Sequence, residues 1–387
     1  LWQVVAERLA GGTPRERLLY FSFEDERLAG MAAADLHLVV DEYYRLHPES
    51  RDGQRVVFLL DEIQNVPGWE GFARRLLDTE SVDLFLSGSS AKLLSREVAT
   101  SMRGRALEVV VHPFSFREAL RHSGREPGQA ADRLPKSVRS VVQHALREYL
   151  TCGGFPEAQG IDARDRFDLL RSYVDVALLR DVIERHGVSN PVALRWMTRH
   201  LLAAAGGLFS VGKFHHDLRS QGIPAAKDTL HAYLAYLEDA FLVHTISVAG
   251  GSERRRMVNP RKAYPVDAGL IPIYDRGGRA NLGHALETCV LLELVRRSAD
   301  VTYVRTKGGH EVDFLARYHD GREDLIQVCA DLDTDEARER EVRGLLEAAR
   351  EYGRAKLHLV TLTPHSLPNL AARIEVHDAA EWLLIPG

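Results

Sequence analysis

The nine residues 56–64, VVFLLDEIQ, set the fold of this 387-residue chain. Residues 56–60 are all apolar, which is long enough for a strand that is buried on both faces and far too short for a membrane span. Asp61 and Glu62 follow at the carboxyl end of this strand, and that edge is where open α/β sheets bind their ligands. The stretch therefore predicts a central parallel strand with two carboxylates at its ligand-binding end.

An apolar strand that ends in Asp-Glu is the arrangement that P-loop ATPases use. In such a site Asp61 would hold Mg²⁺ through water, and Glu62 would polarise the attacking water. The same pattern arises where an ordinary strand runs into a solvated turn, so this alternative stays open. The remaining sequence favours the nucleotide interpretation.

The composition is globular, with 45% hydrophobic and 27% charged residues, and the length suits two or three domains. Cys152, Cys289 and Cys329 are scattered, which argues against a disulfide framework and against a zinc site and suits a reducing cytosol. The net charge is −5, so a nucleic-acid-binding surface must be a local patch. No signal peptide or membrane-spanning stretch is visible, so we expect a cytoplasmic protein without membrane contact.

The first residues carry apolar side chains at helical spacing, and Gly11 and Gly12 end that pattern. A phosphate-binding loop, G-x-x-x-x-G-K-[ST], leads directly into such a helix, yet this motif is not found in these residues. Either the loop lies immediately upstream of Leu1, or the protein does not bind nucleotide in that way. We expect the first alternative.

Strands and helices alternate through the first ninety residues. Residues 18–23 and 82–86 are strand-like, residues 31–46 are expected to be helical, and Trp69 begins a further stretch with helical spacing. This rhythm predicts an α/β domain with a parallel sheet and right-handed crossovers.

The third strand runs into the turn Ser87-Gly88-Ser89-Ser90, and a predicted helix then ends near Arg103 and Arg105. Ser87 or Ser89 would act as a polar sensor beside the γ-phosphate, although a serine here also suits a helix N-cap. Either arginine would be a finger that completes the site of a neighbouring subunit, which implies a homo-oligomer. The alternative is a solvated helix end that the helix dipole favours.

Several stretches in fixed order carry a family resemblance: LLDEIQNVPGWE, FLSGSSAKLLSREVATSMRGR, HPFSFREAL, YLTCGGFPEA, LLRSYVDVALLRDVIERHGV and NPRKAYPVDAGL. The chain resembles the AAA-type ATPases of bacteria and archaea that carry a poorly characterised C-terminal domain. The resemblance implies a Walker B pair at Asp61 and Glu62, a sensor within 87–90 and an arginine motif at Arg103 and Arg105. It also implies ATP and Mg²⁺ as cofactors.

The predicted division has three parts. Residues 1–125 form the AAA-type ATPase domain, residues 126–250 a helical lid with a winged-helix-like region, and residues 251–387 a nuclease-like domain. A loop rich in Gly, Pro and charge over 124–136 separates the first part from the second.

Residues 209–243 have the pattern of a helix-turn-helix. Ser210 can cap the first helix and Gly222 can end it, and the second helix leaves polar residues exposed near its start. The predicted nucleic-acid-binding residues on this second helix are Lys227, Thr229 and His231.

A basic turn follows the helix pair. Arg254, Arg255 and Arg256 come after two glycines, and Arg261 and Lys262 lie close behind them. The wing of a winged helix offers such a turn to the phosphates of double-stranded DNA. Helix-turn-helix units also dock proteins, so a partner protein remains the alternative.

The last third has the order of a PD-(D/E)xK nuclease core, in which two acids hold Mg²⁺ and a lysine steadies the attacking water. Glu287 and Asp313 occupy acid positions, whereas Gln327 replaces the second acid and Cys329 replaces the lysine. A neutral amide is a weaker Mg²⁺ ligand than a carboxylate, and a thiol supplies no fixed cation. We therefore expect a degenerate nuclease site without activity, unless Asp331 or Lys307 stands in.

A charged helix over 335–352, a final strand over 357–362 and a short helix near Trp382 are expected to close the chain. The predicted function is ATP binding, with hydrolysis that requires Mg²⁺ and is coupled to a C-terminal region that contacts DNA or protein. A Mg²⁺-dependent DNA nuclease and a non-hydrolysing adaptor remain the alternatives.

Overall fold

The computed structural model describes residues 1–51, 55–88, 104–250, 259–275, 281–332, 334–363 and 373–385. The chain divides into two compact units, Leu1–Val111 and His112–Gly387, and each has its own hydrophobic core. It is an α/β protein with a parallel sheet in the first unit and mixed and antiparallel sheets in the second. No helix in the described part of the chain combines the length and apolar character needed to cross a membrane.

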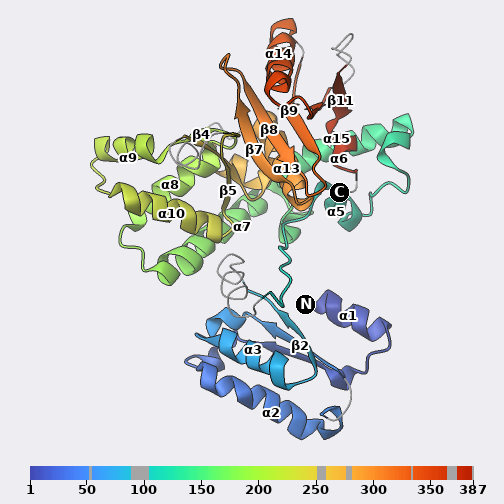
Figure 1. Cartoon of the computed structure of the whole chain (residues 1–387), viewed down its shortest axis with the longest axis vertical. Helices are drawn as coiled ribbons and strands as arrows, with labels where there is room; N and C mark the ends of the chain where they lie inside the picture. The colour runs from blue at the N-terminus through green and yellow to red at the C-terminus, as the bar shows by residue number, and fades with distance from the viewer. Residues whose placement is uncertain are drawn as a thin grey trace. The chain divides into compact units, whose positions relative to one another are not determined.

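The first unit is built on a three-stranded parallel sheet in the order β1-β2-β3 (Figure 1). Its strands are β1 (Leu18–Ser22), β2 (Val56–Asp61) and β3 (Val82–Leu86). Residues 56–60 of the central strand are at most 3% exposed, as expected for a strand that is covered on both faces. The central parallel strand predicted from VVFLLDEIQ is confirmed.

Among the described residues of this unit, three α-helices accompany the sheet: α1 (Trp2–Ala10), α2 (His37–Leu46) and α3 (Trp69–Thr79). Helix α3 buries Trp69, Phe72 and Leu76 along one side, as their helical spacing predicts. Helix α2 begins later than position 31, because a 3₁₀ turn over Ala33–Leu36 precedes it.

The second unit begins with a helical part. Its α-helices and π-helix are α5 (Phe116–His122), α6 (Lys136–Cys152), α7 (Ala163–Val176), the π-helix η8 (Ala177–Glu184), α8 (Pro191–Ala203), α9 (Val211–Ser220) and α10 (Lys227–Asp239). The Ser210 hydroxyl accepts a hydrogen bond from the Lys213 amide at the start of α9, and Gly222 has a positive φ of 73° just after it. The helix pair over 209–243 is therefore confirmed as helices.

A small antiparallel sheet packs with these helices. It has the order β4-β6-β5 and consists of β4 (Leu208–Phe209), β5 (Val243–Ile246) and β6 (Arg261–Pro265). After β5 the chain continues along β7, where Val248 forms a parallel bridge with Tyr303. This bridge brings the small sheet to the edge of a larger one.

The larger sheet has five strands in the order β11-β10-β9-β8-β7. They are β7 (Asp300–Arg305), β8 (Glu311–Arg317), β9 (Glu323–Cys329), β10 (Lys356–Thr361) and β11 (Ile374–Asp378). Apolar residues on one face form a cluster with α6 and α13 (Leu282–Arg296), and those on the other face form a cluster with α14 (Asp335–Glu351). Two short helices, α12 (Ile271–Tyr274) and α15 (Ala379–Trp382), complete this unit.

The prediction that 357–362 is the final strand is wrong, because β11 follows β10 and pairs with it in parallel. Strand β11 lies at the edge of the sheet and carries Glu375, His377 and Asp378 among its five residues. The other strands were predicted from runs of apolar residues. Strand β11 has no such run, so the sequence pattern did not indicate it.

Two of the quoted motifs meet in the core of the second unit. The buried carboxylate of Asp267 accepts hydrogen bonds from the Gly154 amide at 2.7 Å and the Gly269 amide at 2.8 Å. A side chain on Gly154 would collide with the Phe114 carbonyl, so only glycine allows this approach. The stretches CGGF and VDAGL are therefore one packing unit, although 113 residues separate Gly154 from Asp267.

Candidate functional site

Asp61 ends the central strand of the first unit and is held by side chains from both neighbouring strands. Its Oδ2 accepts a hydrogen bond from the Tyr20 hydroxyl at 2.6 Å, and its Oδ1 accepts one from the Ser87 hydroxyl. The Tyr20 ring in turn packs against Trp2, with ring centroids 4.5 Å apart. The hydrogen bond to Asp61, together with burial, raises the pKa of Tyr20, so this hydroxyl remains a donor at neutral pH.

Glu62 has a left-handed backbone conformation, with φ 54° and ψ 38°. Residues other than glycine adopt this region infrequently, at a cost of about 1–2 kcal/mol. Glu62 Oε2 accepts a hydrogen bond from Gln64 Nε2 at 2.5 Å. The two acids that adjoin in sequence therefore have different hydrogen-bond partners.

The structure brings Asp61 and Ser87 into direct contact, and the sequence had indicated both. The contact between Tyr20 and Asp61 was not predicted from the sequence. The register of the parallel strands β1 and β2 accounts for it. Ser22 pairs with Asp61, and Tyr20 lies two residues before Ser22 on the same face of the sheet.

The predicted arginine motif is only partly described. Arg105 is exposed and forms an ion pair with Asp78, with Nη1 2.7 Å from Oδ1. Asp78 lies near the end of α3, the helix that leads from β2 back to the start of β3, so this contact is not at the Asp61 edge. Arg103 and Ser89 lie outside the described residues, and all three assignments stay predictions.

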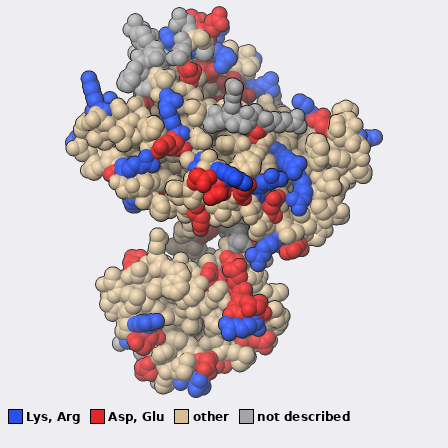
Figure 2. Space-filling model, turned by 180° about the vertical axis from the view of Figure 1, so that it is seen from behind, with Lys and Arg blue, Asp and Glu red and all other residues tan. Residues whose placement is uncertain are grey.

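Three of the predicted nucleic-acid-binding residues, Lys227, Thr229 and His231, lie in the first two turns of α10. Lys227 and His231 are exposed and Thr229 is half-buried. Arg254, Arg255 and Arg256 lie outside the described residues. Figure 2 shows Lys and Arg side chains interspersed with Asp and Glu side chains on the face that it displays. DNA binding by these residues stays a prediction.

A buried cluster of charges lies where the small sheet meets the large one. The ammonium of Lys262, on β6, is 3.0 Å from Glu287 Oε1 on α13, 2.8 Å from Glu311 Oε1 and 2.9 Å from Asp313 Oδ1 on β8. Lys262 is only 2% exposed. The Tyr264 hydroxyl also donates to Glu287 Oε1, at 2.7 Å. One cation therefore stands at the centre of three carboxylates, and these four charged residues are called the Lys262 cluster below.

A β-bulge aims Asp313 at Lys262. Leu315 pairs with Thr302 and Val312 pairs with Val304, so β8 has one residue more than β7 between these pairs. The Asp313 amide then donates to Gln327 Oε1 at 3.3 Å. The second carboxylate oxygen of Asp313 accepts from the Val328 amide at 3.0 Å. Gln327 thus supports Asp313 from β9 and donates its own amide N–H to Glu341 on α14, at 2.7 Å.

Burial and charge act in opposite directions on the titration of the Lys262 cluster. Burial alone would lower the pKa of Lys262, but the carboxylates of Asp313, Glu287 and Glu311 raise it by more, so the side chain stays an ammonium. Burial first, and the charge of Asp313 second, raise the pKa of Glu287 to about 8. Glu287 therefore holds a proton near neutral pH.

The structure corrects the interpretation of Lys262 as a phosphate-contacting residue of a wing. A 2% exposed ammonium bound to three carboxylates cannot reach a phosphate. The alternation of a strand would have revealed this, because Lys262 must share a face with the apolar Tyr264. Lys307, which was considered as a substitute cation, is exposed in the turn after β7.

Cys329 contributes no charge to the Lys262 cluster. Its thiol donates to the Asp331 carbonyl at 2.8 Å, and burial raises the pKa of Cys329 to about 11. The thiol is therefore neutral at physiological pH. Of the four residues assigned to a degenerate nuclease site, the structure links Glu287, Asp313 and Gln327 through hydrogen bonds and adds Lys262 to them.

Comparison with known proteins defines the class. Residues 1–120 match a family described as "AAA domain", and residues 143–275 match one described as "Domain of unknown function (DUF8612)". This chain is a member of the AAA-type P-loop ATPases. The parallel sheet and the Asp-Glu pair at the end of its central strand agree with this class.

The particular family follows from relatives that match along most of their length. The uncharacterized protein MJ1544 of Methanocaldococcus jannaschii is 30% identical over 354 residues, which cover 90% of this chain and 76% of that protein. An uncharacterized protein of Haemophilus influenzae is 30% identical over 376 residues, or 96% of this chain and 88% of that protein. The chain belongs to this bacterial and archaeal family of AAA-type ATPases with a C-terminal domain of unknown function, and the resemblance seen in its motifs is confirmed.

Among solved structures, the Walker-type ATPase PABY2304 of Pyrococcus abyssi matches with a TM-score of 0.39 and 13% sequence identity. The match covers 70% of this chain and 87% of that chain. So distant a likeness carries no argument of its own about the site.

The AAA domain implies a nucleotide, with Mg²⁺ as the usual partner of its phosphates. The donors at the β2 edge fit such an ion, because a carboxylate and a hydroxyl are the hard oxygen ligands that Mg²⁺ accepts. Asp61 would hold the ion, directly or through water, and Ser87 would fix the orientation of the Asp61 carboxylate.

Proposed function

We propose that this protein binds ATP with Mg²⁺ and hydrolyses it at the edge of the parallel sheet formed by the ends of β2 and β3. The observation that carries this proposal is the placement of Asp61. It ends a strand buried on both faces, and hydroxyls from both neighbouring strands hold its two carboxylate oxygens. A carboxylate fixed in this way is preorganised for a metal ion.

In this proposal each residue at the edge of the sheet has its own role. Asp61 binds Mg²⁺, which supplies charge neutralisation on the phosphates when it is bound. Glu62 accepts a proton from the attacking water and directs it, since its carboxylate is bonded to Gln64 and does not share the hydroxyl partners of Asp61. Ser87, at the end of the neighbouring strand, senses the γ-phosphate through its link to Asp61. Arg103 and Arg105 are candidates for a finger that acts on a neighbouring subunit, and this role requires a homo-oligomer.

The test is phosphate release by the full-length protein and its Glu62→Gln variant. Losing a catalytic base lowers kcat by a factor of about 10² to 10⁴, while ATP binding, measured by equilibrium titration, persists. Glu42→Gln is the control, because that carboxylate is exposed on α2 and pairs with Arg45 of the same helix. Unchanged phosphate release in Glu62→Gln would remove the hydrolysis proposal.

We further propose that ATP turnover is coupled to contacts that the second unit makes with duplex DNA or with a partner protein. The support is the helix pair α9 and α10, with Lys227 and His231 exposed at the start of the second helix. Lys227→Ala should weaken DNA binding and reduce its salt slope by about 1, because one phosphate is then no longer neutralised. Lys213→Ala, on the exposed side of α9, is the control. A salt slope that is unaltered in Lys227→Ala and in the triple change of Arg254, Arg255 and Arg256 to Ala would favour the partner protein.

For the nuclease-like part we propose a binding role and not cleavage. The Lys262 ammonium occupies the middle of the acids that would hold Mg²⁺ in an active PD-(D/E)xK centre. The ammonium takes the place between these carboxylates that a metal ion would occupy. Plasmid cleavage by the Mg²⁺-supplemented protein, if lost in Asp313→Ala, would revive the nuclease alternative.

A further inference from the structure

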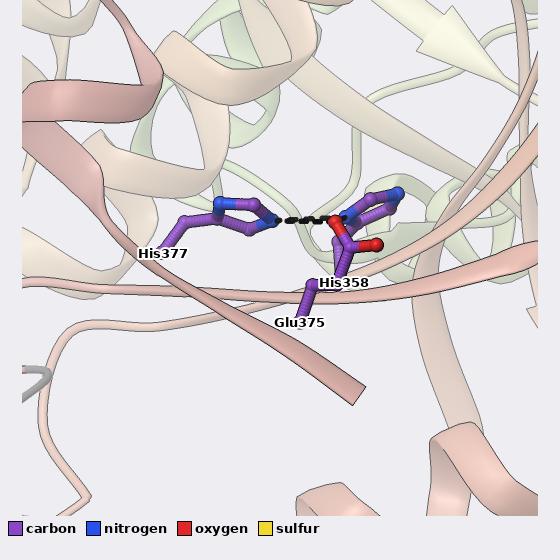
Figure 3. Close-up of side chains that lie close together, drawn as sticks. All are labelled: His358, Glu375 and His377. Atoms are coloured by element: carbon purple, nitrogen blue, oxygen red, sulfur yellow. Dashed lines mark hydrogen bonds and ion pairs between the residues drawn. The ribbon is translucent and has the colours of Figure 1, made fainter. Parts of the chain in front are cut away.

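Two histidines and a glutamate converge at the outer edge of the five-stranded sheet (Figure 3). His358 lies on β10, and Glu375 and His377 lie on the edge strand β11. The parallel register pairs His358 with Glu375 and Val360 with His377, so the three polar side chains leave the same face of the sheet. Figure 3 shows their ends turned toward one another.

The distances between the three ligand atoms match those around a metal ion. His358 Nδ1 is 2.9 Å from His377 Nε2 and 3.5 Å from Glu375 Oε2, and the last two atoms are 3.8 Å apart. A triangle with these sides has a circumscribed radius of about 2.0 Å. Zn²⁺ binds imidazole nitrogen and carboxylate oxygen at about 2.0–2.2 Å. One ion can therefore reach all three atoms at bonding distance without any movement of the strands.

We propose that His358 Nδ1, His377 Nε2 and a carboxylate oxygen of Glu375 bind a divalent transition-metal ion, with Zn²⁺ as the preferred ion and water as the fourth ligand. Two imidazoles and one carboxylate form a donor set that suits Zn²⁺, whereas Mg²⁺ and Ca²⁺ prefer oxygen ligands alone. The scattered cysteines argued against a zinc site, but that argument concerned thiolate ligands, and none of these ligands is a cysteine.

The contact between His358 and Asp324 is independent support for His358 as a metal ligand. His358 Nε2 and Asp324 Oδ1 are buried, lie 3.5 Å apart and have no other hydrogen-bond partner among the described residues. Histidines that bind metals usually direct the second ring nitrogen at a carboxylate, which keeps the proton on that nitrogen. With the proton on Nε2, the lone pair of His358 lies on Nδ1, the atom that faces His377 and Glu375.

The site is buried on one side and open on the other. Side-chain exposure rises from 11% for His358 through 23% for His377 to 58% for Glu375. The two imidazoles therefore form the sheltered part of the group, and the carboxylate lies at its solvent side. The exposed carboxylate gives an ion a path to the site and leaves room for a water ligand.

A bound ion would join the edge strand to its neighbour. Strand β11 has one strand partner within the described part of this sheet, so its attachment depends on the ladder with β10 and on α15. Coordination by His358 on β10 and by Glu375 and His377 on β11 would add a link between the two strands. The ion would thus stabilise the C-terminal end of the sheet.

The test uses untagged full-length protein that has been treated with chelator and dialysed. Titration with ZnCl₂ should show one site of micromolar or tighter Kd, and Co²⁺ should give the visible absorption of a low-coordinate nitrogen and oxygen site. His377→Gln and Glu375→Gln should each weaken Zn²⁺ binding by about 100-fold or more. Asp324→Asn, which removes the negative charge beside His358 Nε2, should weaken it by about 10- to 100-fold.

His310→Ala is the matched control, because His310 also faces a carboxylate, with Nε2 3.6 Å from Glu347 Oε2, but is not part of the three-ligand group. Its Zn²⁺ affinity should equal that of the wild type. Glu375→Gln changes an exposed side chain and is the variant that retains the fold if His377→Gln does not. Zn²⁺ binding that persists in Glu375→Gln and His377→Gln, or a wild type with no more Zn²⁺ than these variants, would overturn the proposal.

Discussion

The ammonium of Lys262 lies 2.9 Å from the carboxylate of Asp313, although the two residues belong to different sheets. This ion pair fastens the small sheet of the second unit to the large one. Because Glu287 and Glu311 bind the same ammonium, Lys262 also connects α13 and the start of β8. One buried cation therefore links both sheets and α13 of the second unit.

Lys262→Met should destabilise the protein by about 3–5 kcal/mol, since breaking a buried ion pair leaves its carboxylates uncompensated. Mg²⁺ or Mn²⁺ should then restore part of the stability of this variant, because three carboxylates form a hard-ligand site once the ammonium is gone. An ion at about 100 times its Kd would contribute about 2.7 kcal/mol. Thermal unfolding with and without the ion measures both effects. Arg261→Met, at the neighbouring position, is the control, and equal unfolding temperatures for the two variants would contradict the prediction.

The stability contribution of Glu287 should change with pH in a defined direction. Its folded-state pKa of about 8 lies above the ordinary glutamate value, so the folded protein binds the proton more tightly than the unfolded chain does. Stability relative to Glu287→Gln should consequently fall as pH rises from about 5 to about 8, on the order of 1 kcal/mol per pH unit. Chemical unfolding of both proteins at several pH values tests this. Asp267, whose pKa is raised by burial to about 6, contributes equally to both proteins and cancels.

The left-handed backbone of Glu62 predicts that the residue lowers the stability of the first unit, although its carboxylate is needed for the proposed activity. Glu62→Gly should be more stable than Glu62→Ala by about 1 kcal/mol, because glycine adopts a positive φ without the penalty that a Cβ imposes. Both variants should lack the ATPase activity proposed for the wild type. Urea unfolding of the two variants isolates the backbone effect, since neither retains the carboxylate. Equal stabilities would show that the turn changes its conformation in the variants.

Gly154→Ala should destabilise the second unit by about 1–3 kcal/mol, because the added methyl group meets the Phe114 carbonyl and must displace it. The hydrogen bond from the Gly154 amide to Asp267 would be broken by that displacement. Gly128→Ala is the matched control, since a Cβ there meets no described atom within 4 Å. The difference in unfolding temperature between the two variants measures the effect. An unfolding temperature of Gly154→Ala equal to that of the wild type would contradict the prediction.

Local patterns were sufficient for most elements. The apolar run over 56–60, the helical spacing of Trp69, Phe72 and Leu76, and the cap at Ser210 each predicted an element that the structure contains. Strand β11 was missed, because an edge strand is covered on fewer sides and tolerates polar residues such as Glu375 and His377. The metal site proposed at this edge was missed with it.

The parallel sheet and the carboxylates at its edge could be inferred from the sequence, because strand burial and side-chain alternation are recorded in neighbouring residues. The family was indicated by the resemblance of the quoted motifs. The role of Lys262 could not be inferred from the sequence. Its sequence neighbours are basic, and its partner Asp313 is 51 residues away on another sheet. Likewise, His358 and His377 meet only because β10 and β11 pair in parallel. Contacts between separate strands and sheets depend on how those elements dock, and no local pattern of residues records that docking.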